Sequence, residues 1–288
     1  MTTPQNDDQN TSPLVKSFDW LLRHLNDKNL VIVDASWFLP AQNRNGQQEY
    51  DAAHIQGVVF FNQDKIIDTQ SALPHALPDP QTFANAVGAL GINEDDTIIV
   101  YDALGMFTAP RVWWMFKIMG ASNVFVLDGG FDTWKSSGLP ITSDTTTITI
   151  KQFTPFFDKD AVANIDDIFA SLKDEDTQLL DARGAGRFTG EEAEPRAGMR
   201  SGHMPGAINT PVFSLSENGK LKSIKQLKEI FESKSVTLNK PIITTCGSGV
   251  TAAVITLALH SVGATDTKLY DGSWSEWGLR DDTPIEQG

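Results

Sequence analysis

Short runs of apolar or β-branched residues recur along the chain, and segments with apolar residues at helical spacing lie between them. Six runs read as buried parallel strands, which are hydrophobic on both faces: Leu30–Val33, Thr97–Tyr101, Val124–Leu127, Gln178–Leu180, Pro241–Thr245 and Thr267–Tyr270. Helical patterns such as Pro110–Met119 and Thr251–Val262 each stop at a glycine, a usual C-terminal helix signal. This alternation of strands and helices predicts an α/β fold with a parallel sheet covered by helices on both faces.

The pattern occurs twice. Asp34 and Asp181 are 147 positions apart, Asp102 and Cys246 are 144 apart, and other landmarks keep nearly the same offset. We interpret the chain as a tandem duplication. The predicted organisation is an N-terminal domain over 12–142, a linker over 143–160 that matches neither copy, and a C-terminal domain over 161–288. Part of the linker is expected to lie along a domain surface.

Composition narrows the possible functions. The chain has 288 residues, which suggests about two domains. Its 23 Lys and Arg against 37 Asp and Glu give a net charge of −14, which argues against a nucleic-acid partner. No apolar run approaches the roughly 20 residues of a membrane span, and the polar opening from Met1 to Asn10 resembles no targeting signal. We therefore expect a cytoplasmic protein without membrane contact.

The single cysteine stands in a loop suited to activating it. One cysteine excludes an intramolecular disulfide and a multi-cysteine zinc site. No metal and no cofactor are expected. Cys246 follows a predicted strand, and Gly247 and Gly249 leave the loop before the next helix free to curl. A curled backbone directs several N–H groups at one centre, and the helix adds the positive end of its dipole. A thiol there is expected to ionise readily and act as a nucleophile.

The alternative is that Cys246 is an inert buried side chain, as lone cysteines often are. The other copy serves as an internal control, because Asp102 stands in the place of the cysteine and ALGMFTAPR replaces the glycine-rich loop. Only one copy keeps a nucleophile, which favours a reactive Cys246.

These residues resemble the tandem rhodanese family from about Leu14 to Pro284, and the resemblance implies two rhodanese-like domains. The loop CGSGVT at 246–251 is similar to the active loop of 3-mercaptopyruvate sulfurtransferases, whereas thiosulfate-using rhodaneses carry two basic residues after the cysteine. Phosphatases of this fold need an arginine six positions after the cysteine, where this chain has Ala252. Phosphatase chemistry is therefore not expected.

The resemblance also implies which residues bind and turn over the donor. Arg187 and Arg196 match the substrate-binding arginines of the family, which suit a ligand with a carboxylate and a ketone. Surface ion pairs with neighbouring glutamates are the alternative for both, and Arg183 is expected to make a local ion pair. Ser248 is grouped in the family with an acid and a histidine from the first copy, matched here by Asp64 and His75. His54 and His203 belong to a repeated turn and are expected to be structural.

The predicted function is sulfur transfer from 3-mercaptopyruvate through a persulfide on Cys246. The backbone N–H groups from Gly247 to Thr251, among them those of Gly249 and Val250, would hold the persulfide. A small thiol, thioredoxin or cyanide would then accept the sulfur. A monomer is expected, because fused domains already supply the cleft between them. A thiosulfate sulfurtransferase and a non-catalytic sulfur carrier are the alternatives.

Overall fold

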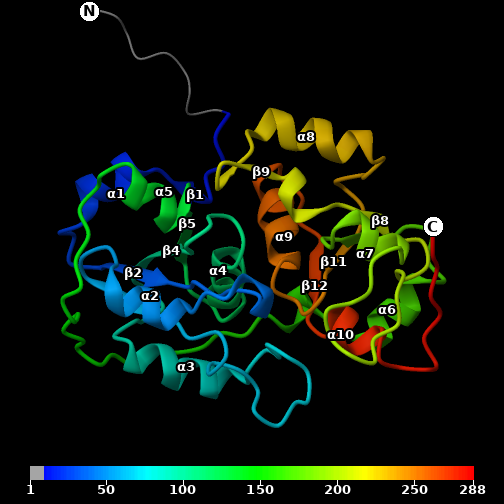
Figure 1. Ribbon diagram of the computed structural model, residues 1–288, viewed down its shortest axis with the longest axis horizontal. Helices are drawn as coiled ribbons and strands as arrows, with labels where there is room; N and C mark the ends of the chain where they lie inside the picture. Colours follow the sequence, from blue (N-terminus) through cyan, green and yellow to red (C-terminus); the bar gives the residue numbers. More distant parts are fainter. Residues whose placement is uncertain (1–9) are drawn as a thin grey trace, which may run out of the picture.

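Two five-stranded parallel sheets organise residues 10–288, the part of the chain that this computed structural model describes (Figure 1). The polar opening segment, for which no targeting signal was expected, lies outside the described residues except for Asn10. Within 10–288 no helix is both long and apolar enough to cross a membrane.

The two sheets have the same strand order, as expected of a duplication. The first runs β1-β5-β4-β2-β3 and the second β6-β12-β11-β7-β8, with every neighbouring pair parallel. The strands of the first sheet are β1 (Val15–Lys16), β2 (Leu30–Asp34), β3 (Val58–Phe60), β4 (Thr97–Tyr101) and β5 (Asn123–Leu127). Those of the second are β6 (Val162–Ala163), β7 (Gln178–Asp181), β8 (Ile208–Asn209), β11 (Ile242–Thr245) and β12 (Thr267–Tyr270).

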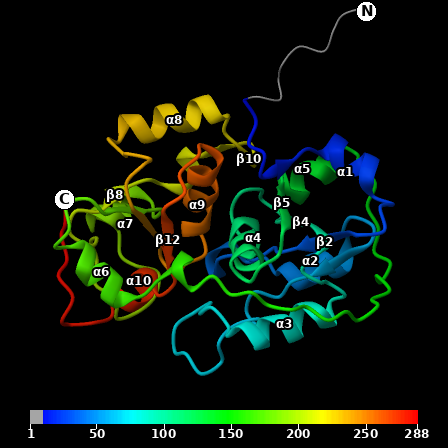
Figure 2. The same cartoon turned by 180° about the vertical axis from the view of Figure 1, so that it is seen from behind.

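Helices cover both faces of each sheet, which confirms the predicted fold class (Figure 2). The first copy contributes α1 (Phe18–His24), α2 (Gly46–Ala52), α3 (Pro80–Ala89), α4 (Ala109–Ile118) and α5 (Gly130–Ser136). The second contributes α6 (Ile165–Ser171), α7 (Ala185–Thr189), α8 (Ile224–Ser233), α9 (Ala252–Ser261) and α10 (Ser273–Trp277). Three 3₁₀ turns complete the set: η1 (Pro40–Gln42), η2 (Lys159–Ala161) and η3 (Val212–Ser214).

The two copies share one hydrophobic core. α4 and α9 pack against each other between the sheets, and one continuous cluster of buried apolar residues runs from one sheet to the other. Every residue of α4 is buried except Lys117, and every residue of α9 except His260. A helix that is apolar on all sides belongs in an interior, and here a sheet covers one side and the partner helix another. The domain interface is therefore a fixed part of the fold.

The sequence missed the shortest elements. Every predicted strand and helix is present with each end within one residue, but β1, β3, β6 and β8 were not predicted. Neither was the antiparallel hairpin of β9 (Ser216–Glu217) and β10 (Lys220–Leu221). Strands of two or three residues are too short to show a period, so only their neighbours in the sheet define them.

The linker segment lies along the first copy. The Lys151 N–H donates to the Gly88 carbonyl at 3.0 Å, and the Lys151 ammonium pairs with Asp96 at 2.7 Å. Phe153 is buried against the aromatic rings of Phe83 and Phe116. A Cβ at position 88 would lie 2.5 Å from the Lys151 carbonyl oxygen, so this close approach requires glycine.

The equivalent aspartates at the ends of β2 and β7 have different partners. Asp181 makes an ion pair with Arg183 at 2.6 Å, as predicted for Arg183. Asp34 has Ser36 in place of that arginine and accepts the Ser36 N–H at 2.8 Å. Burial raises the pKa of Asp34 to about 6, although the Ser36 hydrogen bonds and others lower it in part. The ionised form of this carboxyl is therefore disfavoured inside the fold.

Asp34→Asn is expected to stabilise the protein by more at pH 8 than at pH 4.5. The pKa of Asp34 is higher in the folded chain than in the unfolded one, so the folded state binds more protons and loses stability as pH rises through about 6. The asparagine keeps the acceptor for Ser36 and removes the charge, a gain of at most about 3 kcal/mol. Denaturant unfolding at both pH values measures it, and an equal effect at both would contradict the assignment.

Candidate active site

Cys246 lies where β11 ends, and α10 holds the backbone around it. The Cys246 N–H donates to Ser273 Oγ at 3.2 Å, and the Cys246 carbonyl accepts the Trp274 N–H at 3.0 Å. The next carbonyl, of Gly247, accepts both the N–H and the hydroxyl of Ser275, at 2.8 and 2.6 Å. These bonds fix the direction in which the loop leaves the sheet.

The loop from Gly247 to Thr251 leaves its amides unused. None of its five backbone N–H groups donates to an acceptor within residues 10–288. Gly249 has a φ of +76°, and a Cβ there would lie 2.8 Å from the Asp271 carbonyl oxygen, so the turn requires glycine. Free amides on a tight turn before a helix are a typical anion-binding arrangement.

The first copy shows what such a loop binds. Asp102 occupies the position of the cysteine, and its buried carboxylate accepts four backbone N–H groups at 2.5–3.0 Å, those of Gly105, Phe107, Thr108 and Ala109. The loop of this fold thus converges its amides on an anion at the end of the strand. In the first copy that anion is the Asp102 side chain, whereas in the second copy Cys246 stands at this position and its loop amides have no acceptor within residues 10–288.

A pocket of about 360 Å³ lies between the two copies over Cys246. The first copy contributes mostly apolar walls to it, among them Trp37, Leu39 and Phe107. The second contributes Arg183, Arg187, Arg196, Phe213 and the Cys246 loop. The thiol is only 1 % exposed, yet it lines this pocket. Cys246 is therefore reachable by a small molecule, unlike an inert core cysteine.

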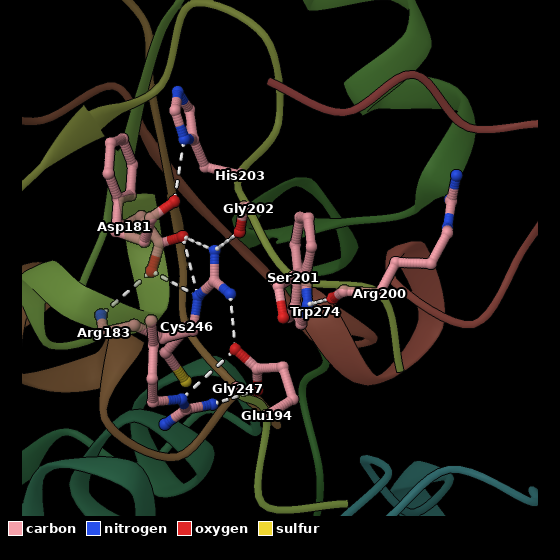
Figure 3. Close-up of polar contacts among 12 residues, drawn as sticks. Asp181, Arg183, Glu194, Arg200, Ser201, Gly202, His203, Cys246, Gly247 and Trp274 are labelled. Atoms are coloured by element: carbon pink, nitrogen blue, oxygen red, sulfur yellow. Dashed lines mark hydrogen bonds and ion pairs between the residues drawn. The ribbon is translucent and has the colours of Figure 1, made fainter. Parts of the chain in front are cut away.

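Arg187 belongs to a buried chain of charges and not to a set of surface pairs. The Glu194 side chain is 1 % exposed and pairs with Arg183 at 2.8 Å, and Arg183 also pairs with Asp181 (Figure 3). Glu194 pairs with Arg187 as well, at 2.5 Å. A Cβ on Gly247 would lie 3.0 Å from Arg187 Nη2, so the guanidinium lies against the loop. Burial of Glu194 was not foreseen, because its neighbours in the sequence are exposed glutamates.

Arg196 brings a second cation to the same place without a carboxylate bonded to it. Its Nη1 donates to Ser275 Oγ at 3.0 Å, and no carboxylate hydrogen-bonds it within the described residues. Burial, and then the charge of Arg187, lower the pKa of Arg196, whereas the charge of Cys246 opposes them. The two arginines and the thiol are thus close enough to affect one another electrostatically. An anionic ligand in this pocket would balance the positive charge of the arginines.

The structure brings Asp64 and His75 together but does not join Ser248 to them. His75 Nδ1 lies 3.4 Å from the Gln63 carbonyl oxygen and 3.7 Å from Asp64 Oδ1. Burial lowers the pKa of His75, so the ring is neutral at pH 7. Ser248 lines the pocket, and no hydrogen bond links its hydroxyl to His75 within residues 10–288. A complete triad stays a prediction.

Trp37 connects the acid to the pocket, and the sequence did not single it out. Its Nε1 donates to Asp64 Oδ1 at 2.9 Å, and its ring meets the His75 ring edge-on with centroids 4.7 Å apart. Its only sequence signal was its place shortly after the Leu30–Asp34 strand, which the repeat aligns with the strand before Arg183.

Two further expectations concern histidines and metals. His54 Nδ1 bonds the Tyr50 carbonyl at 2.7 Å and His203 Nδ1 bonds the Phe188 carbonyl at 2.9 Å, so both are structural, as predicted. Within the part of the chain described, no three His, Cys, Asp or Glu side chains are grouped as metal ligands.

Comparison with known proteins finds the same duplication. The family described as Rhodanese-like domain matches the chain twice, over residues 17–137 and 165–280. The 3-mercaptopyruvate sulfurtransferase of Escherichia coli K12 is 44% identical over 93% of this chain and 96% of its own length. The mitochondrial thiosulfate/3-mercaptopyruvate sulfurtransferase 1 of Arabidopsis thaliana is 39% identical over 96% of this chain and 79% of its own length. The crystal structure of SseA from E. coli superposes with a TM-score of 0.84 at 41% identity, covering 91% of this chain and 99% of that one.

Proposed function

The chain belongs to the rhodanese family in its tandem-domain form, and from that premise we propose that it moves sulfur from 3-mercaptopyruvate, through a persulfide on Cys246, to an external thiol or cyanide. The observation that carries the proposal is the position of the thiol. It lines a pocket between the domains together with two arginines, at the start of a loop with unused amides. This combination fits an anionic sulfur donor.

In the first half-reaction the Cys246 thiolate attacks the sulfur of 3-mercaptopyruvate. The S–S bond forms as the C–S bond breaks, and the electron pair leaves on carbon as the enolate of pyruvate. Arg187 and Arg196 hold the carboxylate and stabilise the charge that develops on the ketone oxygen. The proton lost by the donor sulfur is the one that the enolate carbon needs, and neutral His75 beside Asp64 is suited to carry it.

In the second half-reaction the outer sulfur of the persulfide passes to an acceptor. The open amides of Gly247–Thr251 would hold its charge as those of the first copy hold Asp102. Because Cys246 is the only cysteine in the sequence, the chain cannot resolve the persulfide as an internal disulfide. The acceptor, a small thiol, thioredoxin or cyanide, must come from outside.

The scheme predicts ping-pong kinetics. Pyruvate leaves before the acceptor binds, so double-reciprocal plots at several acceptor concentrations should be parallel. Intersecting lines, which require both substrates bound at once, would contradict a persulfide intermediate.

Thiosulfate is the rival donor, and one relative carries both donors in its name. Thiosulfate is a compact dianion that favours positive charge directly after the cysteine, where this chain has Gly247 and Ser248. A larger side chain at 247 would also compete with Arg187 for space. We expect kcat/KM for mercaptopyruvate to exceed that for thiosulfate by at least about tenfold. The reverse ratio would make the protein a thiosulfate sulfurtransferase.

A non-catalytic sulfur carrier is a different class of function. Donor alone would load Cys246 with sulfur in either case, so loading does not separate the two. Only the enzyme would then release sulfur repeatedly to a free small thiol or cyanide, and a single turnover with every free acceptor would favour the carrier.

Arg187→Ala is expected to raise KM for mercaptopyruvate by roughly 30- to 100-fold with a smaller change in kcat, because a charged hydrogen bond to the donor carboxylate is lost. Steady-state kinetics measure the split. Arg44→Ala is the matched control, since Arg44 also forms ion pairs, with Glu49 and Asp132, but does not line the pocket over Cys246. Equal KM effects in both variants would show that Arg187 acts only on the fold.

A further inference from the structure

Asp271, at the end of β12, connects the catalytic copy to the first one. Its Oδ1 accepts a bond from Arg111 Nη2 at 2.5 Å, and its Oδ2 accepts the Leu77 N–H at 2.8 Å. Arg111 comes from α4 and Leu77 from the loop that carries His75, so both partners belong to the first copy. One carboxylate thus holds two first-copy segments against the second sheet.

Arg111 extends the connection to both parts of the proposed machinery. The Arg111 side chain is 2 % exposed. Its Nη2 donates to the His75 carbonyl at 2.9 Å, and its Nη1 lies 3.4 Å from the Gly249 carbonyl oxygen. Its guanidinium also lies over the Trp114 ring at 4.8 Å. His75 has a φ of +57°, a conformation that a non-glycine residue keeps only when its surroundings impose it. The contacts of Arg111 and Asp271 supply that constraint.

The first copy repeats half of this arrangement. Asp128 is 143 positions before Asp271, and its Oδ1 accepts the N–H of Leu221 from the second copy at 2.8 Å. No arginine pairs with Asp128 within residues 10–288, and burial raises its pKa to about 6. Both aspartates therefore accept a backbone N–H from the other copy, but within residues 10–288 only Asp271 also pairs with a buried arginine.

We propose that Arg111 and Asp271 form a cross-domain positioning pair, which sets the Gly249 turn of the Cys246 loop and the backbone of His75 relative to each other. Neither residue lines the pocket over Cys246, so the pair acts through the groups that it holds. The inference rests on the proposed function, because it assigns His75 and the loop to one reaction. It predicts that breaking the pair slows the chemical step strongly and weakens donor binding much less.

The test compares Asp271→Asn, Arg111→Met and Arg111→Lys with Asp128→Asn as the matched control. Asp271→Asn keeps an acceptor for Leu77, and Arg111→Lys keeps the charge but loses the forked geometry. With mercaptopyruvate as donor, we expect kcat to fall at least about tenfold in the first two variants while KM stays within about threefold. Arg111→Lys should recover part of the loss, and Asp128→Asn should stay within about twofold of wild type.

A second measurement is the rate at which iodoacetamide alkylates Cys246 at pH 7, with each variant shown to be folded by circular dichroism at that temperature. We expect Asp271→Asn and Arg111→Met to slow alkylation at least about threefold, because the loop amides lose their position. This readout needs no sulfur donor. If wild type released no pyruvate, the proposed function would fail, and alkylation would still judge the pair.

Either of two results would overturn the inference. One is a wild-type kcat and a wild-type alkylation rate in folded Asp271→Asn and Arg111→Met. The other is an equal loss in Asp128→Asn, which would mean that any cross-domain carboxylate contact matters equally and that the arginine has no special part.

Discussion

Replacing Cys246 by serine is expected to lower kcat with mercaptopyruvate by at least about 10⁴-fold, to the background of the assay. A serine hydroxyl is not ionised at neutral pH, and no second cysteine in the sequence could take over. The fold should be unaffected, because the exchange is small and the bonds that hold position 246 come from its backbone. Pyruvate release and sulfide or thiocyanate formation, followed together, measure the loss.

Ser248→Ala is the control for this variant. It changes a side chain of the same loop that lines the pocket but makes no hydrogen bond to His75. We expect Ser248→Ala still to form the persulfide on Cys246, with a change in rate that differs between mercaptopyruvate and thiosulfate as donors. Residual pyruvate release by Cys246→Ser at more than a small fraction of the wild-type rate would place the chemistry on another group.

The second large effect is expected in the copy without a nucleophile. Asp102→Ala should lower the free energy of unfolding by about 4 kcal/mol or more, because four buried N–H groups lose their shared acceptor at once. The loop cannot turn these groups to water, since its residues from Met106 to Ala109 are buried. Urea unfolding followed by tryptophan fluorescence measures the change.

Asp102→Asn separates the hydrogen bonds from the size of the side chain. The amide keeps one acceptor oxygen, and burial raises the pKa of the Asp102 carboxyl, so losing the charge is partly favourable. Asparagine should therefore cost less than half of what alanine costs. Equal destabilisation by both would mean that packing, and not the converging amides, makes Asp102 important.

Much of the architecture could be predicted from the sequence because its signals are local or repeated. The buried strands are continuous apolar runs, the helices stop at glycine, and the near-constant offset between Asp34 and Asp181 or Asp102 and Cys246 reveals the duplication. The nucleophile loop was visible for the same reason, since Gly247 and Gly249 stand beside the cysteine. The contrast with Asp102 then led to the prediction that the second copy carries the reactive group.

The rest depends on contacts between distant segments. Glu194 looks like one of several surface glutamates until the fold buries it between Arg183 and Arg187. Trp37 meets His75 only because a loop of the first copy folds over it. Arg111 and Asp271 are 160 positions apart, and no local pattern connects them.

The most direct test of the central claim is the intact mass of the protein after exposure to 3-mercaptopyruvate alone. The account predicts a gain of one sulfur atom per chain, absent in Cys246→Ser, together with one molecule of pyruvate released per sulfur bound. Pyruvate formed without any gain in mass, or a gain of sulfur that persists in Cys246→Ser, would contradict it.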